Sequence, residues 1–262
     1  MLSDQKIRDA ALALLEAEAT CKPILQPSKQ WPEMELADAY KVQQAWAEER
    51  IRRGARAVGH KIGLTSRAMQ MASKINEPDY GVLLDDMLYA DGASIPATRF
   101  HAPRLEVELA FVLGKTVGGK GVHTTIFDVL DATSYVTPAL EIIDYRTDVP
   151  RAIVDTIADN AAAAAMVTGG RVVRPMDVDL RWVGATISKN GVIEESGVSA
   201  AVMGHPAMGI VWLANKLAVH GIALEKGQIF LGGSFTRPTS VEAGDTIVAD
   251  YGPLGSIGVK FI

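Results

Sequence analysis

The sequence predicts an α+β fold, with a helical N-terminal part (residues 1–80) followed by a β-rich catalytic body (residues 81–262). Before residue 80, apolar residues recur at helical spacing in two long segments. After it, short apolar runs are separated by Gly, Pro and Asp, a pattern typical of strands joined by turns. The boundary is a change in this pattern more than a linker.

Composition and charge exclude several classes of protein. The chain has 262 residues and a net charge of −5, and no cluster of Lys and Arg runs unopposed, so we expect no nucleic-acid binding. Cys21 is the single cysteine, which excludes a disulfide framework and a cysteine-based zinc site. The first residues lack the pattern of a signal peptide, and no apolar run is long enough to span a membrane. We therefore expect a cytoplasmic protein.

Two helices are expected in the N-terminal part. Residues 4–20 form the first, with Ser3 as its N-cap, and residues 36–53 form the second, which Gly54 ends. Their apolar stripes are Ile7, Ala11, Leu14 and Leu15 in the first helix, and Ala39, Val42 and Trp46 in the second. A short strand over residues 58–63 follows, with Ser66 capping another helix.

The β-rich body combines strands with a few helices. The predicted strands are residues 105–113, 135–144, 228–231 and 257–262, and the predicted helices are residues 124–132 and 206–220. Asn190-Gly191 predicts a tight hairpin within residues 185–193. The alanine run 161–165 either extends a helix from residue 155 or leads into a strand.

Two glutamates lie two residues apart in the first of these strands. A strand has a side-chain period of two, so Glu106 and Glu108 point to the same face, and their neighbours on both faces are apolar. Burying two carboxylates is costly unless a cation neutralises them, which favours half of a divalent-metal site. The alternative is a solvated strand face.

A third carboxylate, Glu141, lies in another apolar run. Three carboxylates suit Mg²⁺ or Mn²⁺, which prefer oxygen ligands. These strands carry no His or Cys, so zinc is less favoured.

One residue is a candidate for proton transfer. Lys61 is flanked by glycine and apolar residues, so it is either a partly desolvated lysine with a lowered pKa or a surface lysine. Asp79, in the turn 77–81, is better explained as a turn residue when it is taken alone.

Two further stretches are candidates for substrate binding. Gly233, after an apolar strand, allows close backbone approach to a ligand, and Ser234 and Thr236 offer hydroxyl groups beside it. Asp159 and Asn160 form a polar island that either faces a site or caps a turn.

Six stretches of the sequence resemble, in this order, the hydratase/decarboxylase family of meta-cleavage pathways, part of the fumarylacetoacetate hydrolase superfamily. They are His60–Ser66, Glu77–Gly81, Glu106–Glu108, Pro138–Glu141, Asp159–Ala161 and Gly232–Thr236. The resemblance covers nearly the whole chain. It implies a mixed β-sheet roll with surrounding helices, and a homo-oligomer.

The resemblance also implies roles for the candidate residues. Glu106, Glu108 and Glu141 look like ligands of Mg²⁺, or of Mn²⁺, and Lys61 and Asp79 look like an acid/base pair. Ser234 looks like a contact to the substrate carboxylate, with Gly233, Thr236, Asp159 and Asn160 as further substrate-binding candidates.

The expected substrate is a small 2-oxo diacid of seven carbons, to which the enzyme adds water. Decarboxylases of the family usually carry an apolar residue where Asp79 stands, and hydratases carry aspartate. A hydratase also needs a group that takes a proton from water. Hydration of a five-carbon 2-oxo-alkenoate and decarboxylation of a 2-oxo diacid are the alternatives. Candidates to bind the distal carboxylate are His60, Arg67, Lys74 and Arg237.

Overall fold

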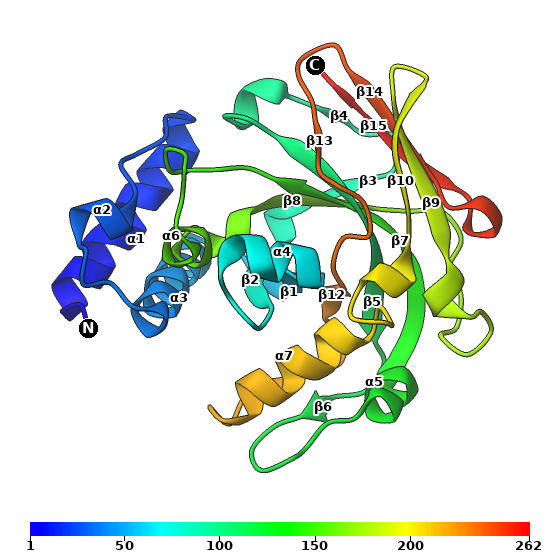
Figure 1. The fold of residues 1–262 in the computed structure, drawn as a ribbon, viewed down its shortest axis with the longest axis horizontal. Helices are drawn as coiled ribbons and strands as arrows, with labels where there is room; N and C mark the ends of the chain where they lie inside the picture. Colours follow the sequence, from blue (N-terminus) through cyan, green and yellow to red (C-terminus); the bar gives the residue numbers. More distant parts are fainter.

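The computed structural model describes the backbone of residues 1–262 and every side chain other than those of Ala72 and Ser73. Its helices are α1 (Asp4–Thr20), α2 (Pro27–Gln30), α3 (Leu36–Arg52), α4 (Arg67–Ser73), α5 (Ile126–Ala132), α6 (Ile153–Ala158) and α7 (Met208–Ala218). Helices α1, α2, α3 and α6 lie together at one end of the molecule, and the sheets make up most of the rest (Figure 1). Along the described backbone, no helix combines the length and the apolar character that crossing a membrane requires.

The strands form one large sheet, one smaller sheet and a short pair. They are β1 (Ala57–Gly63), β2 (Asp79–Leu84), β3 (Leu88–Ala90), β4 (Ser94–Ile95), β5 (Arg104–Leu113), β6 (Val117–Gly118), β7 (Thr133–Ile143), β8 (Ala163–Thr168), β9 (Gly184–Lys189), β10 (Val192–Val198), β11 (Ala223–Leu224), β12 (Ile229–Leu231), β13 (Thr239–Ser240), β14 (Thr246–Asp250) and β15 (Ser256–Phe261). The large sheet has the order β2-β1-β12-β5-β7-β8-β3, and β13 also pairs with β5. The smaller sheet has the order β10-β9-β14-β15-β4, and β11 pairs with β6.

The two larger sheets are mixed, and the main hydrophobic core is built from both. Strand β1 pairs with β12 in parallel and β3 with β8 in parallel, whereas β5 and β7 are antiparallel. Val107, Leu109 and Phe111 on one face of β5 share this core with Ile187 of β9 and Ile257 of β15. The α+β fold class is confirmed, and so is the predicted alternation of side chains along β5.

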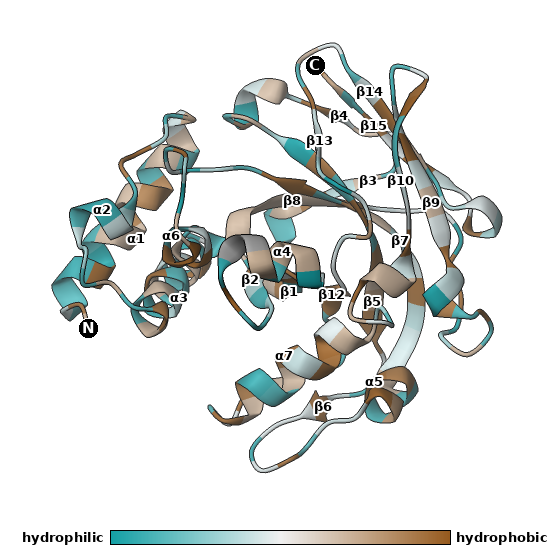
Figure 2. Cartoon of the chain, in the orientation of Figure 1, coloured by the Kyte–Doolittle hydropathy of each residue, from teal (hydrophilic) through white to brown (hydrophobic). Residues whose placement is uncertain are grey.

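A second core fixes the helices to the large sheet. Leu14 of α1 and Trp46 of α3 are fully buried in it, together with Leu84 at the end of β2. The Ser3 hydroxyl accepts a hydrogen bond from the Lys6 backbone N–H, which confirms the predicted cap of α1. Figure 2 shows polar residues over α2 and apolar residues along β8.

The predicted boundary near residue 80 falls inside β2. Both β1 and β2 belong to the large sheet, with Lys61 directly opposite Gly81. The helices α1, α2 and α3 therefore precede the first strand, which begins at Ala57, and α6 from the later part of the chain packs against α3. Local spacing predicts strands, but their membership of a sheet depends on distant pairing.

The hairpin prediction is confirmed and the alanine run is divided between two structures. Asn190 and Gly191 both have positive φ, as a tight hairpin turn requires. The short turn η3 (Asn160–Ala162) contains three consecutive residues with positive φ, after which Ala163 begins β8. A left-handed turn thus replaces the helix that alanine propensity favours.

Candidate metal centre and active site

Strands β5 and β7 bring the three predicted glutamates together. Glu106 lies directly opposite Glu141 in the antiparallel pair, and Glu108 lies two residues further along the same face of β5. One carboxylate oxygen from each residue lies within 4.8 Å of the other two. Glu108 and Glu141 are almost fully buried, and Glu106 is partly exposed.

The electrostatics of this cluster favour a bound cation. Burial and the neighbouring Glu141 raise the pKa of Glu106 to about 7, and burial, Glu141 and Glu106 raise the pKa of Glu108 well above its ordinary value. Both oxygens of Glu141 are buried without a hydrogen-bond partner among the described residues. A hard divalent cation would satisfy these oxygens, so the donor set fits Mg²⁺ or Mn²⁺.

Lys61 of β1 reaches this cluster, although β12 lies between β1 and β5 in the large sheet. Its Nζ lies 3.3 Å from Oε1 of Glu141 and donates a 2.9 Å hydrogen bond to the carbonyl oxygen of Ala161. Burial alone would lower the pKa of Lys61, but Glu141 and the other carboxylates outweigh it and raise the pKa. The sequence-based expectation of a lowered pKa is therefore wrong, because the charge of the neighbouring carboxylates outweighs desolvation.

Asp79, at the start of β2, lies beside Lys61. Gly63 faces Asp79 across the β1–β2 pair, and a Cβ atom at Gly63 would lie 2.3 Å from Oδ1 of Asp79 and 3.1 Å from Nζ of Lys61. The side chains of Lys61 and Asp79 therefore both lie next to Gly63, where the lack of a side chain leaves room for them. Burial raises the pKa of Asp79, and Lys61 partly offsets this.

The glycine-rich turn after β12 closes the other side of the cluster. The Gly233 backbone N–H donates a 2.8 Å hydrogen bond to Oε2 of Glu108, and Gly233 has a φ of +122°. The Ser234 hydroxyl donates to the carbonyl oxygen of Thr236 at 2.9 Å. The Thr236 hydroxyl accepts from the backbone N–H of Val107 at 3.3 Å.

Asn160 holds the strained turn η3 against β2. Its side-chain amide donates to the carbonyl oxygen of Val82 at 2.9 Å, and its side-chain oxygen accepts from the backbone N–H of the same residue at 2.7 Å. This pair of hydrogen bonds positions the next residue, Ala161, whose carbonyl oxygen binds Lys61. Sequence analysis missed Ala161, because a backbone carbonyl leaves no signal in residue type.

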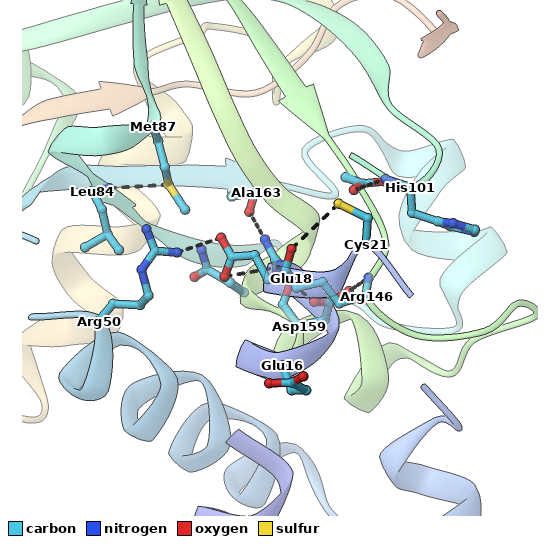
Figure 3. A network of polar contacts seen from close by, with 12 residues as sticks. Glu16, Glu18, Cys21, Arg50, Leu84, Met87, His101, Arg146, Asp159 and Ala163 are labelled. Atoms are coloured by element: carbon cyan, nitrogen blue, oxygen red, sulfur yellow. Dashed lines mark hydrogen bonds and ion pairs between the residues drawn. The ribbon is translucent and has the colours of Figure 1, made fainter. Parts of the chain in front are cut away.

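Asp159 lies in a polar network with Arg146 and Glu18 of α1 (Figure 3). Its Oδ1 accepts a 2.7 Å hydrogen bond from Nη1 of Arg146, and its Oδ2 lies 3.3 Å from Nη1 of Arg151. Arg146 stacks on Trp46 of α3, with 5.3 Å between Cζ and the ring centroid. The side chain of Asp159 is therefore in a structural position, and a substrate contact through it stays an untested prediction.

A cavity of about 1260 Å³ opens above the cluster. Lys61, Asp79, Glu106, Gly63, Ser234 and Thr236 line it at this end. Lys74 and Arg237 also line it, whereas His60 is packed against Phe230 on the other face of β1 and Arg67 is not among the lining residues. The structure therefore removes His60 and Arg67 as candidates for the distal carboxylate, because strand alternation turns His60 away from Lys61.

The comparisons with known proteins agree with this geometry. The family model for the fumarylacetoacetate (FAA) hydrolase C-terminal region matches residues 51–261. The 2-oxo-hept-4-ene-1,7-dioate hydratase of Escherichia coli is 52% identical over 259 residues, which is 96% of each chain. A 4-oxalocrotonate decarboxylase of Pseudomonas putida is 36% identical and covers 97% of this chain and 98% of its own.

A solved structure shares the whole fold. The 4-oxalocrotonate decarboxylase from Pseudomonas putida G7, complexed with magnesium and adipate, superposes with a TM-score of 0.96 at 35% identity. The superposition covers 100% of this chain and 99% of that one.

Proposed function

This chain belongs to the fumarylacetoacetate hydrolase family, and we propose that it adds water to 2-oxohept-4-ene-1,7-dioate to give 4-hydroxy-2-oxoheptanedioate. The observation that carries the proposal is the placement of Asp79 and Lys61 together beside three converging glutamates. The 52% identity to a hydratase of this substrate supports the choice of reaction.

Glu106, Glu108 and Glu141 hold Mg²⁺ in this proposal. When bound, the ion supplies a Lewis acid that polarises the 2-oxo group of a chelating 2-oxo acid. The Gly233 N–H keeps Glu108 oriented, and the ion would satisfy the buried oxygens of Glu141, which make no hydrogen bond to the described residues. Mn²⁺ has the same ligand preference and is the expected substitute.

Lys61 and Asp79 carry the protons in this proposal. Moving the 4-ene into conjugation as the 3-ene removes a proton from C3 and delivers one to C5. Water then adds at C4, losing a proton to a base while C3 gains one. Asp79, whose Oδ1 has no hydrogen-bond partner among the described residues, is free to accept a proton from water. Lys61, held as an ammonium by Ala161 and Glu141, is placed to donate one.

Decarboxylation of a related 2-oxo diacid is the second candidate. The superposition with the decarboxylase at a TM-score of 0.96 favours decarboxylation, because the two proteins share the same fold. Asp79 favours hydration, since decarboxylation needs an electron sink and no base to activate water.

One assay separates the two reactions. The protein is mixed with 2-hydroxyhepta-2,4-dienedioate and Mg²⁺, and with 4-oxalocrotonate and Mg²⁺, while dienoate absorbance and CO₂ release are followed together. Loss of absorbance from the first substrate without CO₂ supports the hydratase. CO₂ release from 4-oxalocrotonate at a higher kcat/KM would assign the decarboxylase instead.

The cellular setting stays a prediction. A role in homoprotocatechuate degradation, a homo-oligomeric state and a cytoplasmic location follow from the reaction proposed and from the family resemblance. Sedimentation velocity of the purified protein tests the oligomer.

A further inference from the structure

Two arginines and one tyrosine form a cluster in the wall of the active-site cavity. Cζ of Arg151 lies 3.6 Å from the ring centroid of Tyr145, and Cζ of Arg104 lies 5.5 Å from the same centroid. All three residues line the cavity that contains Lys61 and Asp79. Stacking on one ring holds both guanidinium groups in defined positions. Ligand binding then orders these side chains at a smaller loss of conformational entropy.

Both guanidinium groups retain unused donors. Among the described residues, Arg151 donates one hydrogen bond, from Nη1 to Oδ2 of Asp159 at 3.3 Å, and its side chain is 9% exposed. Arg104 has neither a hydrogen bond nor an ion pair from its guanidinium to any described side chain. A guanidinium group carries five N–H donors, and a largely buried one is costly unless an anion satisfies it.

The position of the cluster relative to the metal ligands is fixed by strand geometry. Arg104 is two residues before Glu106 on β5, so both side chains lie on the face that carries the glutamates. Arg151 is close enough to Asp79 for its charge to lower the pKa of that carboxyl, although burial is the larger influence and raises it. The cluster therefore lies in the same cavity as the reacting groups, displaced from the three glutamates.

We propose that Arg104 and Arg151, stacked on Tyr145, bind the distal carboxylate of the substrate and so select a diacid over a monoacid. This inference rests on the proposed function, in which the metal end of the site takes the 2-oxo acid. Guanidinium groups bind carboxylates through paired N–H donors, which favours this pair of residues over a lysine.

The other cations that line the cavity are less suited to this task. Nη2 of Arg237 is paired with Oε1 of Glu195 at 2.7 Å, and the Arg237 side chain is 85% exposed. Lys74, the C-cap of α4, is exposed. An exposed ion pair is screened by water and would contribute little to selectivity.

The test compares a diacid with a monoacid in matched variants. Arg151→Gln and Arg104→Gln each remove one guanidinium, and Arg67→Gln is the control because Arg67 is exposed and does not line the cavity. We measure kcat and KM for 2-hydroxyhepta-2,4-dienedioate and for 2-hydroxypenta-2,4-dienoate. With Mg²⁺ present, we also measure binding of two saturated analogues that cannot be hydrated, 2-oxoheptanedioate and 2-oxopentanoate.

Each arginine variant should lower kcat/KM for the diacid by roughly 10- to 100-fold, the loss typical of one charge-assisted hydrogen-bonded contact, mainly through KM. Binding of 2-oxoheptanedioate should weaken by a similar factor. The kcat/KM for the monoacid and the affinity for 2-oxopentanoate should each change by less than roughly threefold. Equal losses for diacid and monoacid would overturn the proposal, because the arginines would then only support the fold or Asp79. An unchanged kcat/KM for the diacid would overturn the proposal as well.

The design separates this inference from the proposed reaction. If the parent protein hydrates neither substrate, the proposed function fails, while selective weakening of 2-oxoheptanedioate binding still supports the arginine pair. If Arg151→Gln fails to fold because Asp159 loses a partner, Arg104→Gln still decides the question, since Arg104 has no such pairing.

Discussion

Nζ of Lys61 lies 3.3 Å from Oε1 of Glu141, although β12 and β5 separate their strands in the large sheet. The lysine reaches across because β12 ends at Leu231, directly opposite Lys61 in the parallel pair. The proposed acid/base residue thus lies beside a proposed metal ligand, and substitutions can separate the two proposed roles.

Replacing Lys61 should abolish turnover and spare metal binding. Lys61→Met keeps the length of the side chain without its charge, and loss of a general acid or base typically costs about 10²- to 10⁴-fold in kcat. Removing a cation 3.3 Å from Glu141 should leave Mg²⁺ affinity unchanged or higher. Stopped assays and Mn²⁺ titration by electron paramagnetic resonance measure the two properties, with the exposed Lys41→Met as control. Near-normal turnover would contradict the acid/base role.

Replacing the proposed metal ligands should have the opposite effect, because it should weaken metal binding itself. Glu106→Gln and Glu108→Gln should weaken Mg²⁺ binding by more than about 100-fold, exceeding the 10- to 100-fold typical of outer-shell changes. EDTA should remove the metal and with it the activity of the parent protein, and added Mg²⁺ should restore that activity. At 100 times Kd, the ion should stabilise the parent by about 2.7 kcal/mol and these variants far less. Glu194→Gln, on the exposed face of β10, is the control. Equal Mg²⁺ affinity in all four proteins would remove the metal assignment.

A methyl group at Gly63 should disturb Asp79. The added Cβ of Gly63→Ala would lie 2.3 Å from Oδ1 of Asp79, so this carboxylate must move. Displacing a reacting group by about 1 Å can cost on the order of 100-fold in rate. We expect a fall in kcat of roughly 10- to 100-fold with unchanged Mg²⁺ affinity. In Gly184→Ala the nearest atom would be 3.7 Å away, so it should behave as the parent.

The metal cluster was predictable because strand periodicity places side chains without knowledge of the fold. Glu106 and Glu108 share a face in any strand, and an apolar run identifies Glu141 as buried. The register that sets Glu106 directly opposite Glu141 was not predictable, because it depends on pairing between distant segments.

The surroundings of Lys61 were not predictable for a different reason. Three residues in the left-handed region at η3 aim the Ala161 carbonyl at Lys61, although alanine favours a right-handed helix. Such strain persists only where tertiary contacts over-determine it, here the two hydrogen bonds of Asn160 to Val82. Single-residue propensities do not contain those contacts.

Asp159 offers a test between a structural role and substrate binding. Its carboxylate neutralises the buried Arg146, and breaking such a pair typically costs about 3–5 kcal/mol. Asp159→Asn should lower the free energy of unfolding by roughly that amount while KM at low temperature changes little. Urea unfolding and steady-state kinetics provide both values. A stable variant with a raised KM would instead support the predicted substrate contact.

His60 should make the protein less stable in mild acid. Burial lowers the pKa of His60 to about 4, below its ordinary value of about 6.5, so the folded protein keeps this side chain neutral. The unfolded chain therefore binds the proton first, and stability present above pH 6.5 is lost as the pH falls towards 4. Between pH 7.5 and pH 5 this amounts to about 2 kcal/mol. His60→Phe keeps the stacking on Phe230 without a titrating group, so its urea-unfolding free energy should fall by about 2 kcal/mol less than that of the parent over this range. Parallel pH dependences for the two proteins would show that His60 is charged in the folded state.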